Sequence, residues 1–270
     1  LVIGAGGAAL RAALAAYEAA PDLDIVIVTK GKLGQSGVTA TACSDRMAFH
    51  ATLPTTEPGG PDAWRYHADD IYRIGGYVSD ADLAQVLARG AAEAFDYLDK
   101  LGVPWVRRED GVVSQFVTDG SIYARACYTG PHTANHIEEA LVRRLSQTPI
   151  RVIEDHMAAE LLLDEARQRV TGAALVRQAD GRVSALAAKA VVLATGGAGQ
   201  VFAVNVFPPD CTGDGYALAY RAGAELVNME FIQIGLCSLK TLLACSGSMM
   251  RALPRLVNDL DEEFLPRYFA

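Results

Sequence analysis

Two glycine-rich turns carry the clearest chemical signal in this chain. The first, Gly4-Ala5-Gly6-Gly7-Ala8-Ala9, follows a short apolar run and fits the pattern G-x-G-x-x-G/A. In that pattern one glycine makes a tight turn, a second lets the backbone approach a pyrophosphate, and a third small residue lets a helix pack closely. The second turn, Ala194-Thr195-Gly196-Gly197-Ala198-Gly199, follows the apolar run 191–193. Because backbone N–H groups at such turns bind anions, the pair predicts a site for a bulky anionic ligand.

A third glycine-containing turn, Cys211-Thr212-Gly213-Asp214-Gly215, carries a carboxylate. Asp214 is placed to accept hydrogen bonds from the hydroxyl groups of a sugar alcohol, such as the ribityl chain of a flavin. The alternative stays open that Asp214 only caps the following helix or complements its dipole. We favour the ribityl contact because two cofactor turns accompany it, and we expect Thr212 to cap the helix.

The residue type at the end of the second expected strand helps to distinguish a unit that binds NAD from one that binds FAD. Units that bind NAD often end this strand with Asp or Glu, which binds the ribose hydroxyls. Here the strand 24–29 ends in Thr29-Lys30, without a carboxylate. This argues against a nicotinamide-dependent reductase built on a single Rossmann unit, and the two glycine turns together predict FAD.

Candidates for a catalytic side chain are weaker, and no catalytic residue is assigned. His132 begins an expected helix, where its ring could face a flavin or could simply belong to a turn. Arg251 and Arg255 could bind an anionic substrate, or could be solvated or paired with acids. The adjacent carboxylates Asp69-Asp70 and Glu138-Glu139 do not face each other on a helix, which makes them poor candidates for acid–base work.

Composition excludes several classes of protein. With 270 residues, 51% hydrophobic and 21% charged, the chain can bury a core as one large or two smaller domains. The net charge of -8 argues against nucleic acid as a partner. The 5 cysteines, odd in number and without C-x-x-C, indicate a reducing compartment and argue against a cluster or metal site in this chain. No apolar run approaches the roughly 20 residues that span a bilayer. We expect a cytoplasmic protein.

The elements that must position the turns form an α/β pattern. A strand at 1–3, a helix at 8–20 and a buried strand at 24–29 make the first unit of a parallel sheet. A strand at 183–193 returns to that sheet and delivers the second glycine turn. Further strands are expected at 112–116, 150–153, 160–164 and 170–177. The last two of these form an antiparallel insertion with the return strand, which a turn at 179–182 joins to them.

Amphipathic helices and a polar loop occupy the rest of the first half. Residues 31–56 are rich in glycine, serine and threonine, which suits a loop packed along a cofactor or an ordinary surface loop. Helices are expected at 62–75, 80–102 and 133–146. In the second helix, apolar residues recur at helical spacing and are expected in the core: Leu83, Val86, Leu87, Ala91, Ala94, Phe95 and Leu98.

The chain is expected to be part of something longer. The first residue is Leu1, and the first strand has only three residues before Gly4, whereas strands usually run to about five or six. We expect an FAD-binding domain over 1–235. Residues 236–270 are then the truncated start of a capping or partner-contacting segment, with a helix over 255–270.

In combination and in this order, the motifs resemble the succinate dehydrogenase/fumarate reductase flavoprotein superfamily, which includes L-aspartate oxidase and the adenylylsulfate reductase flavoprotein subunit. The resemblance covers most of the chain, and only its first motif is common elsewhere. The segments that carry it are 4–13, Thr29-Lys30, 64–70, 98–105, 194–199, 212–215 and 221–233.

The resemblance implies a Rossmann-like FAD-binding domain with a parallel central sheet and an antiparallel β insertion. It implies that the first turn holds the pyrophosphate and that Thr29-Lys30 contact the adenosine ribose. The loop from Ser36 would run along the flavin, and the strand around Met157 would offer backbone groups to the adenine. The implied cofactor contacts are Gly4, Gly6, Gly7, Ala8, Thr29, Lys30, Ser36, Gly37, Thr39, Ala40, Thr41, Met157, Ala158, Ala194, Thr195, Gly196, Gly197 and Asp214.

Departures from the family pattern refine what is expected. Covalent members carry histidine after the serine of the flavin loop, whereas Ser36 is followed by Gly37, so FAD is expected to be non-covalent. The dicarboxylate enzymes continue their Met-Glu-x-x-Gln run into Phe-His-Pro. Here Met229-Glu230-Phe231-Ile232-Gln233 continues into Ile234-Gly235, and an apolar pair cannot bind a carboxylate. The family's capping-domain signatures Thr-Glu-Gly and Arg-Gly-Glu-Gly are also absent from the sequence.

The expected function is that of an FAD-dependent oxidoreductase. A hydride or electron pair would pass between a small anionic organic substrate and FAD, and then to a partner such as an iron–sulfur protein. The alternative is an FAD-holding electron-transfer subunit without its own dicarboxylate site, which the missing Phe-His-Pro favours. We expect an oligomer or complex subunit, held at the inner face of a membrane, if at all, only through partners.

Overall fold

The computed structural model of the chain describes residues 1–44, 47–118, 120–232, 235–241, 252 and 254–268. Contacts divide the chain into a first unit, residues 1–232, and a second unit, residues 233–270. The first contains three sheets and six α-helices among its described residues.

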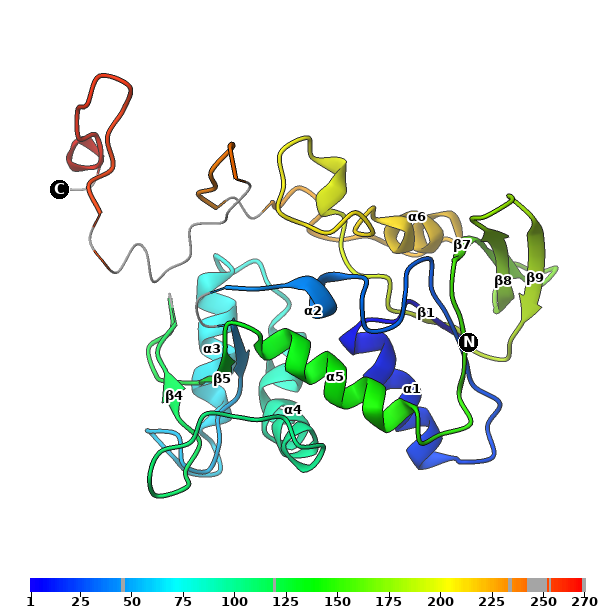
Figure 1. Ribbon diagram of the computed structural model, residues 1–270, viewed down its shortest axis with the longest axis horizontal. Helices are drawn as coiled ribbons and strands as arrows, with labels where there is room; N and C mark the ends of the chain where they lie inside the picture. The colour runs from blue at the N-terminus through cyan, green and yellow to red at the C-terminus, as the bar shows by residue number, and fades with distance from the viewer. Residues whose placement is uncertain (45–46, 119, 233–234, 242–251, 253, 269–270) are drawn as a thin grey trace. The chain divides into compact units, whose positions relative to one another are not determined.

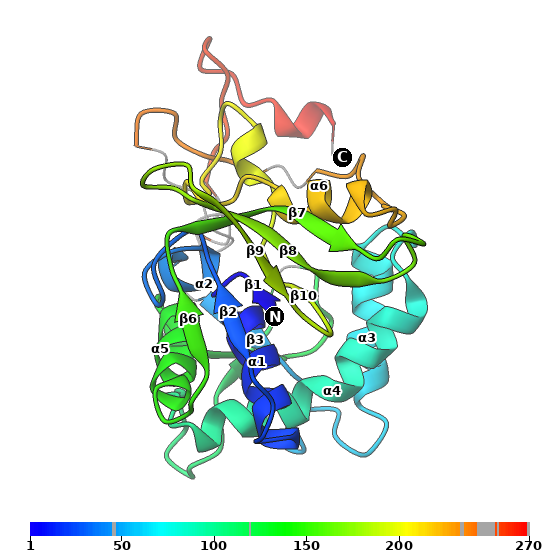
Figure 2. The ribbon, with the colours of Figure 1, turned by 90° about the vertical axis from the view of Figure 1, so that its right-hand side faces the viewer.

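A four-stranded parallel sheet lies at the centre of the first unit (Figure 2). Its strands run in the order β10-β1-β2-β6, and each neighbouring pair is parallel. Val2 of β1 lies opposite Val192 of β10 and opposite Ile27 of β2. The predicted parallel sheet is therefore confirmed, and the four strands are β1 (Val2–Ile3), β2 (Val26–Val28), β6 (Arg151–Ile153) and β10 (Val192–Leu193).

Alternating side chains of these strands fill two separate cores. Val2 and Ile27 pack with helices on one face, whereas Ile3, Val26 and Val28 face the opposite core. Fully burying an aliphatic side chain stabilises a fold by about 1.5–3 kcal/mol, so both faces hold the short strands in place. The helices on the first face are α1 (Gly7–Ala19), α4 (Ala81–Lys100) and α5 (Thr133–Leu145).

The second face is covered by an antiparallel sheet of order β7-β8-β9 together with α6 (Asp214–Arg221). The antiparallel insertion is confirmed, and Gly181 lies in the tight turn between β8 and β9. Two predicted boundaries are wrong. The strand expected at 160–164 begins at His156, and the strand expected at 183–193 is two strands separated by residues 188–191. The three strands are β7 (His156–Leu163), β8 (Val170–Arg177) and β9 (Val183–Ala187).

A third sheet, of order β3-β5-β4, lies beside α3 (Trp64–Ile74) (Figure 1). Its strands are antiparallel. The part of the chain expected to be a continuous loop, 31–56, contains one strand of this sheet and the short helix α2 (Val38–Thr41). Figure 1 also shows α1 and α5 side by side. The strands are β3 (Met47–His50), β4 (Gln115–Phe116) and β5 (Ala126–Gly130).

The buried stripe of α4 differs from the predicted one. Leu83, Val86 and Leu87 are 67%, 67% and 57% exposed, so the expectation that they lie in the core is wrong. The buried residues are Ala84, Ala88, Ala91, Phe95 and Leu98. Since α4 packs along α3, small alanines in its first half let the two backbones approach, and the larger side chains of the neighbouring stripe turn outward.

The second unit has little regular structure among its described residues. The predicted helix over 255–270 is wrong, because the segment forms a tight turn closed by an antiparallel bridge between Val257 and Glu263, then a 3₁₀ turn, Leu265–Arg267. The Asn258 side chain accepts hydrogen bonds from the N–H groups of Leu260 and Glu262, and such local bonds compete with helix formation. Across the described part of the chain, none of the helices has the length and apolar character needed to cross a bilayer.

Candidate cofactor site

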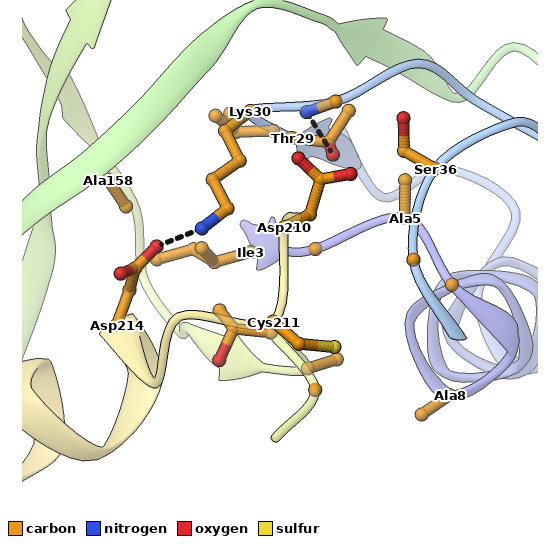
Figure 3. A pocket seen from close by; sticks show the side chains of 18 of the residues that line it. Ile3, Ala5, Ala8, Thr29, Lys30, Ser36, Ala158, Asp210, Cys211 and Asp214 are labelled. Atoms are coloured by element: carbon orange, nitrogen blue, oxygen red, sulfur yellow. Dashed lines mark hydrogen bonds and ion pairs between the residues drawn. The ribbon is translucent and has the colours of Figure 1, made fainter. Parts of the chain in front are cut away.

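A pocket with a cavity volume of about 200 Å³ opens where β1, β2 and β10 end (Figure 3). The start of α1, the loop before α2, the first residues of β7 and the start of α6 complete its wall. The structure brings together fifteen of the predicted cofactor contacts in this wall: Gly4, Gly6, Gly7, Ala8, Thr29, Lys30, Ser36, Gly37, Thr39, Met157, Ala158, Ala194, Thr195, Gly196 and Asp214.

The first glycine turn has the backbone geometry that only glycine allows. Gly4 has a φ of 112°, and a Cβ there would lie 2.1 Å from the carbonyl oxygen of Ala194. Its N–H donates to the carbonyl of Val28, with an N–O distance of 2.8 Å. Gly4 thus forms a hydrogen bond to β2 and leaves space for β10 to approach. The two glycine turns therefore lie at the same edge of the sheet.

The N-terminus of α1 is open to an anion. Its N-cap residue Gly6 makes no side-chain cap, and no acidic residue lies in the first turn. The Gly7 N–H donates to Thr39 Oγ1 at 3.2 Å, so one hydroxyl already binds there. Free N–H groups and the helix dipole attract negative charge at this position.

The segment formed by α2 and the residues just before it lines two different pockets. Ser36, Gly37 and Thr39 line the cofactor pocket, and Gly37 has a φ of 88°. Ala40 instead lines a second pocket, and its carbonyl accepts a hydrogen bond from Asn135 of α5. Ala40, Thr41 and Gly197 are the predicted contacts that the structure does not place in the cofactor pocket wall.

A charged cluster crosses the pocket between β2 and α6. Lys30 Nζ lies 2.6 Å from Asp214 Oδ2 and also donates to the Thr212 hydroxyl, which in turn donates to Asp214 Oδ1 at 2.8 Å. Burial raises the pKa of Asp214, but the bonds from Lys30 and Thr212 outweigh it and lower that pKa below its usual value, so the carboxylate is ionised at neutral pH. Thr212 does not cap α6 as expected, because the N-cap is Gly213 with a φ of 78°.

Sequence reasoning missed several residues of the pocket wall, most notably Asp210 and Cys211. Cys211 is buried, and burial raises the pKa of its thiol, which keeps it neutral. Asp210 carries no motif signal, since it only precedes the turn at 212–215 by two positions. The remaining residues of the wall are Ile3, Ala5, Val28, Gly31, Val38, His156 and Leu218.

Of the weak catalytic candidates, His132 lies outside the wall of the cofactor pocket. His132 is the N-cap residue of α5, and its Nδ1 lies 3.0 Å from Asn135 Oδ1, in the second pocket with Ala40. Arg255, in the second unit, pairs with Glu263 at 3.7 Å, which matches the salt-bridge alternative. Arg251 lies outside the described residues. Where the chain is described, no three His, Cys, Asp or Glu side chains gather as a metal site would require.

The pocket fits the FAD that the sequence predicts. Glycine turns without side chains and an uncapped helix N-terminus suit a diphosphate. The carboxylates of Asp210 and Asp214 can accept hydrogen bonds from sugar hydroxyls. Apolar groups of Met157, Ala158 and Leu218 can pack against a flat ring. Ligand pockets usually combine such an apolar lining with a few convergent polar groups.

Comparison with known proteins identifies the same cofactor class. Residues 1–254 match the model of a family described as FAD binding domain. In Methanothermobacter marburgensis, one chain of the fumarate reductase (CoM/CoB) is 31% identical over 274 residues, which cover 99% of this chain and 48% of that protein. A fumarate reductase flavoprotein subunit of Mycobacterium tuberculosis is 35% identical over 234 residues, covering 86% of this chain and 38% of that protein.

A solved structure shares the architecture. The structure of an E. coli quinol fumarate reductase variant superposes with a TM-score of 0.84 at 28% identity, over 99% of this chain and 44% of that one. The chain therefore spans about half the length, or less, of the relatives it matches.

Proposed function

This chain belongs to the FAD-binding domain family of the succinate dehydrogenase/fumarate reductase flavoprotein superfamily, and from that premise we propose that it serves an FAD-dependent oxidoreductase. FAD is its cofactor. When bound, FAD supplies the hydride and electron-pair chemistry. The substrate we propose is a small anionic organic molecule, with electrons passing on to a partner such as an iron–sulfur protein.

One observation carries the proposal: both glycine turns and Asp214 meet in one pocket although they come from opposite ends of the first unit. The α1 N-terminus would hold the diphosphate, the ends of β1 and β10 would leave space for it, and Asp214 would bind the ribityl hydroxyls. Thr29 and Lys30, at the end of β2, would lie along the adenosine half. Residues of this chain thus bind and orient the cofactor.

We further propose that FAD is held without a covalent bond. Gly37 occupies the position after Ser36 and has no side chain to attach, and its φ of 88° suits glycine. Acid precipitation of the full-length protein tests this directly. Flavin absorbance is expected in the supernatant, and flavin that stays with the pellet would contradict the proposal.

We place the FAD-binding domain over 1–235 and regard 236–270 as the start of a capping or partner-contacting segment. A cytoplasmic location, peripheral to a membrane only through partners, belongs to the same proposal. The E. coli relative is named a quinol fumarate reductase, and that name applies to the E. coli protein alone. Cell fractionation, with and without a high-salt wash, separates a peripheral protein from a cytosolic one.

A second candidate function is an FAD-holding electron-transfer subunit without its own dicarboxylate site. The observation that favours it is the run Phe231-Ile232-Gln233-Ile234-Gly235, which has no histidine where the dicarboxylate enzymes have one. His132 does not line the described pocket.

Anaerobic titration of the full-length flavoprotein with succinate, L-aspartate, and fumarate plus reductant distinguishes the two functions. Bleaching by one donor, or reoxidation by fumarate, supports the oxidoreductase with its own substrate site. A flavin that responds to none of them, yet accepts electrons from a chemical reductant, supports the electron-transfer subunit.

A further inference from the structure

Asp210 places a carboxylate in the cofactor pocket that no motif assigns. It lies on the loop before α6, and Figure 3 shows its carboxylate directed toward Thr29 at the end of β2. A Cβ built on Gly31 would lie 3.4 Å from Asp210 Oδ2, which fixes the carboxylate beside the residues that follow β2. A residue distant in sequence thus contributes its charge to the end of the second strand.

The nearby backbone N–H groups and the Lys30 ammonium are engaged with other acceptors. The Gly31 N–H donates to Thr29 Oγ1 at 3.2 Å, and the Lys32 N–H donates to Ser36 Oγ at 2.8 Å. The Lys30 ammonium is bound by Asp214 and Thr212. Among the described residues, none donates a hydrogen bond to the Asp210 carboxylate or forms an ion pair with it. Its acceptor capacity is therefore available to a ligand.

The end of β2 is also where this chain lacks an expected group. Dinucleotide-binding units commonly place Asp or Glu there to accept hydrogen bonds from the ribose hydroxyls. Thr29-Lys30 provide no carboxylate, and Lys30 points across the pocket to Asp214. A carboxylate has only acceptors to offer, so it repels a diphosphate and selects a ligand group with O–H or N–H donors.

We propose that Asp210 binds the ribose hydroxyls of the adenosine half of FAD, replacing the acidic residue that other units carry at the end of the second strand. The ligand class is a nucleoside diphosphate with an intact ribose. This inference rests on the proposed FAD site and adds to it a residue that discriminates ribose from deoxyribose.

The test compares ADP with 2′-deoxy-ADP as competitors of FAD. Apoprotein is prepared from the full-length protein, FAD binding is followed by flavin fluorescence, and inhibition constants are measured for both nucleotides. Because hydrogen bonds to a charged group are strong, the wild-type protein is expected to prefer ADP by about 10-fold or more. In Asp210→Ala the two nucleotides are expected to bind equally, and in Asp210→Asn the preference falls to an intermediate value.

Asp214→Ala is the matched control, since it removes a carboxylate from the ribityl side of the same pocket. It is expected to weaken FAD binding while keeping the preference for ADP over 2′-deoxy-ADP. Circular dichroism of each variant shows whether it folds, and Asp210→Asn keeps the shape of the side chain if Asp210→Ala does not.

Three outcomes overturn the inference. One is an unchanged ADP preference in Asp210→Ala, and another is tighter binding of both nucleotides in that variant, which would place the carboxylate against the diphosphate. In the third, the wild-type protein binds FAD but binds ADP and 2′-deoxy-ADP equally well. That result contradicts the role of Asp210 but not the proposed function. Failure of the wild-type apoprotein to bind FAD would instead contradict the proposed function together with this inference.

Discussion

Lys30 at the end of β2 and Asp214 at the start of α6 form an ion pair with an Nζ–Oδ2 distance of 2.6 Å, although 184 positions separate them in sequence. Their side chains are 20% and 28% exposed, so solvent screens the pair only in part. The pair connects the two halves of the cofactor pocket.

Double replacement of this pair is expected to reveal a coupling energy of about 1 kcal/mol in the FAD-free protein. The variants are Lys30→Met, Asp214→Asn and the double variant, each unfolded with urea. The coupling arises because each single replacement leaves one polar group without its partner. Additive effects of the two replacements would mean that the pair contributes nothing to stability.

Gly4→Ala is expected to lower the free energy of unfolding by about 3 kcal/mol or more, since it adds both a strained φ and a clash with the Ala194 carbonyl. Gly181→Ala is the matched control. Gly181 has a φ of 71° but no atom within 4 Å of its Cβ position, so only the backbone cost of about 1–2 kcal/mol remains. Equal losses in the two variants would show that the close approach of β10 is unimportant.

Asp70→Asn is expected to destabilise the protein by about 3–5 kcal/mol, because it leaves Arg125 buried without its counter-charge. Asp70 and Arg125 are 1% and 3% exposed and are directly bonded, and Arg73 lies 2.6 Å from the other carboxylate oxygen of Asp70. Asp62→Asn breaks an exposed pair with Arg65 and should cost less than about 1 kcal/mol. Denaturant unfolding of both variants measures the difference.

Glu138 of α5 makes the stability depend on pH. It is 1% exposed, neither carboxylate oxygen has a hydrogen-bond partner, and burial raises its pKa from 4.5 to about 7. Between these values the native state binds more protons than the unfolded state, so this residue lowers the free energy of unfolding as pH rises through that window. The full loss is about 3 kcal/mol, and it persists above the folded pKa.

Unfolding curves of Glu138→Gln and wild type, measured from pH 4.5 to pH 8, test this effect. The stability of the variant relative to wild type is expected to rise across the window and then to level off. Glu139→Gln, at the adjacent exposed position, should follow the wild-type curve. A constant difference between Glu138→Gln and wild type would show that Glu138 does not titrate in this range.

The pocket's backbone is the part of the fold that sequence predicts best, because its constraints are local. A glycine such as Gly4 is required where φ is positive and a neighbouring chain leaves no space for a Cβ. An apolar run before such a turn predicts a parallel strand, and β1, β2 and β10 are confirmed. Residue-by-residue contacts with FAD remain predictions.

Side chains that depend on distant segments could not be predicted in this way. Asp210 lines the pocket because its loop folds back to the end of β2, and no motif in the adjacent sequence predicts this. Leu83 and Ala84 both fit a helical period, and only the packing of α4 against α3 selects the smaller one. The turn at Asn258 likewise replaces a helix because its side chain binds nearby backbone groups.

The pairing of β1 with β10 has a consequence for how the protein is made. Ala194, whose carbonyl closes on Gly4, leaves the ribosome 190 residues later, which at ordinary rates of synthesis is roughly 10–40 s. Throughout that interval the apolar first strand has no partner on its β10 side and the diphosphate turn is incomplete. The nascent chain therefore cannot complete the site for the diphosphate before β10 has emerged, and cofactor loading must follow synthesis of most of the domain.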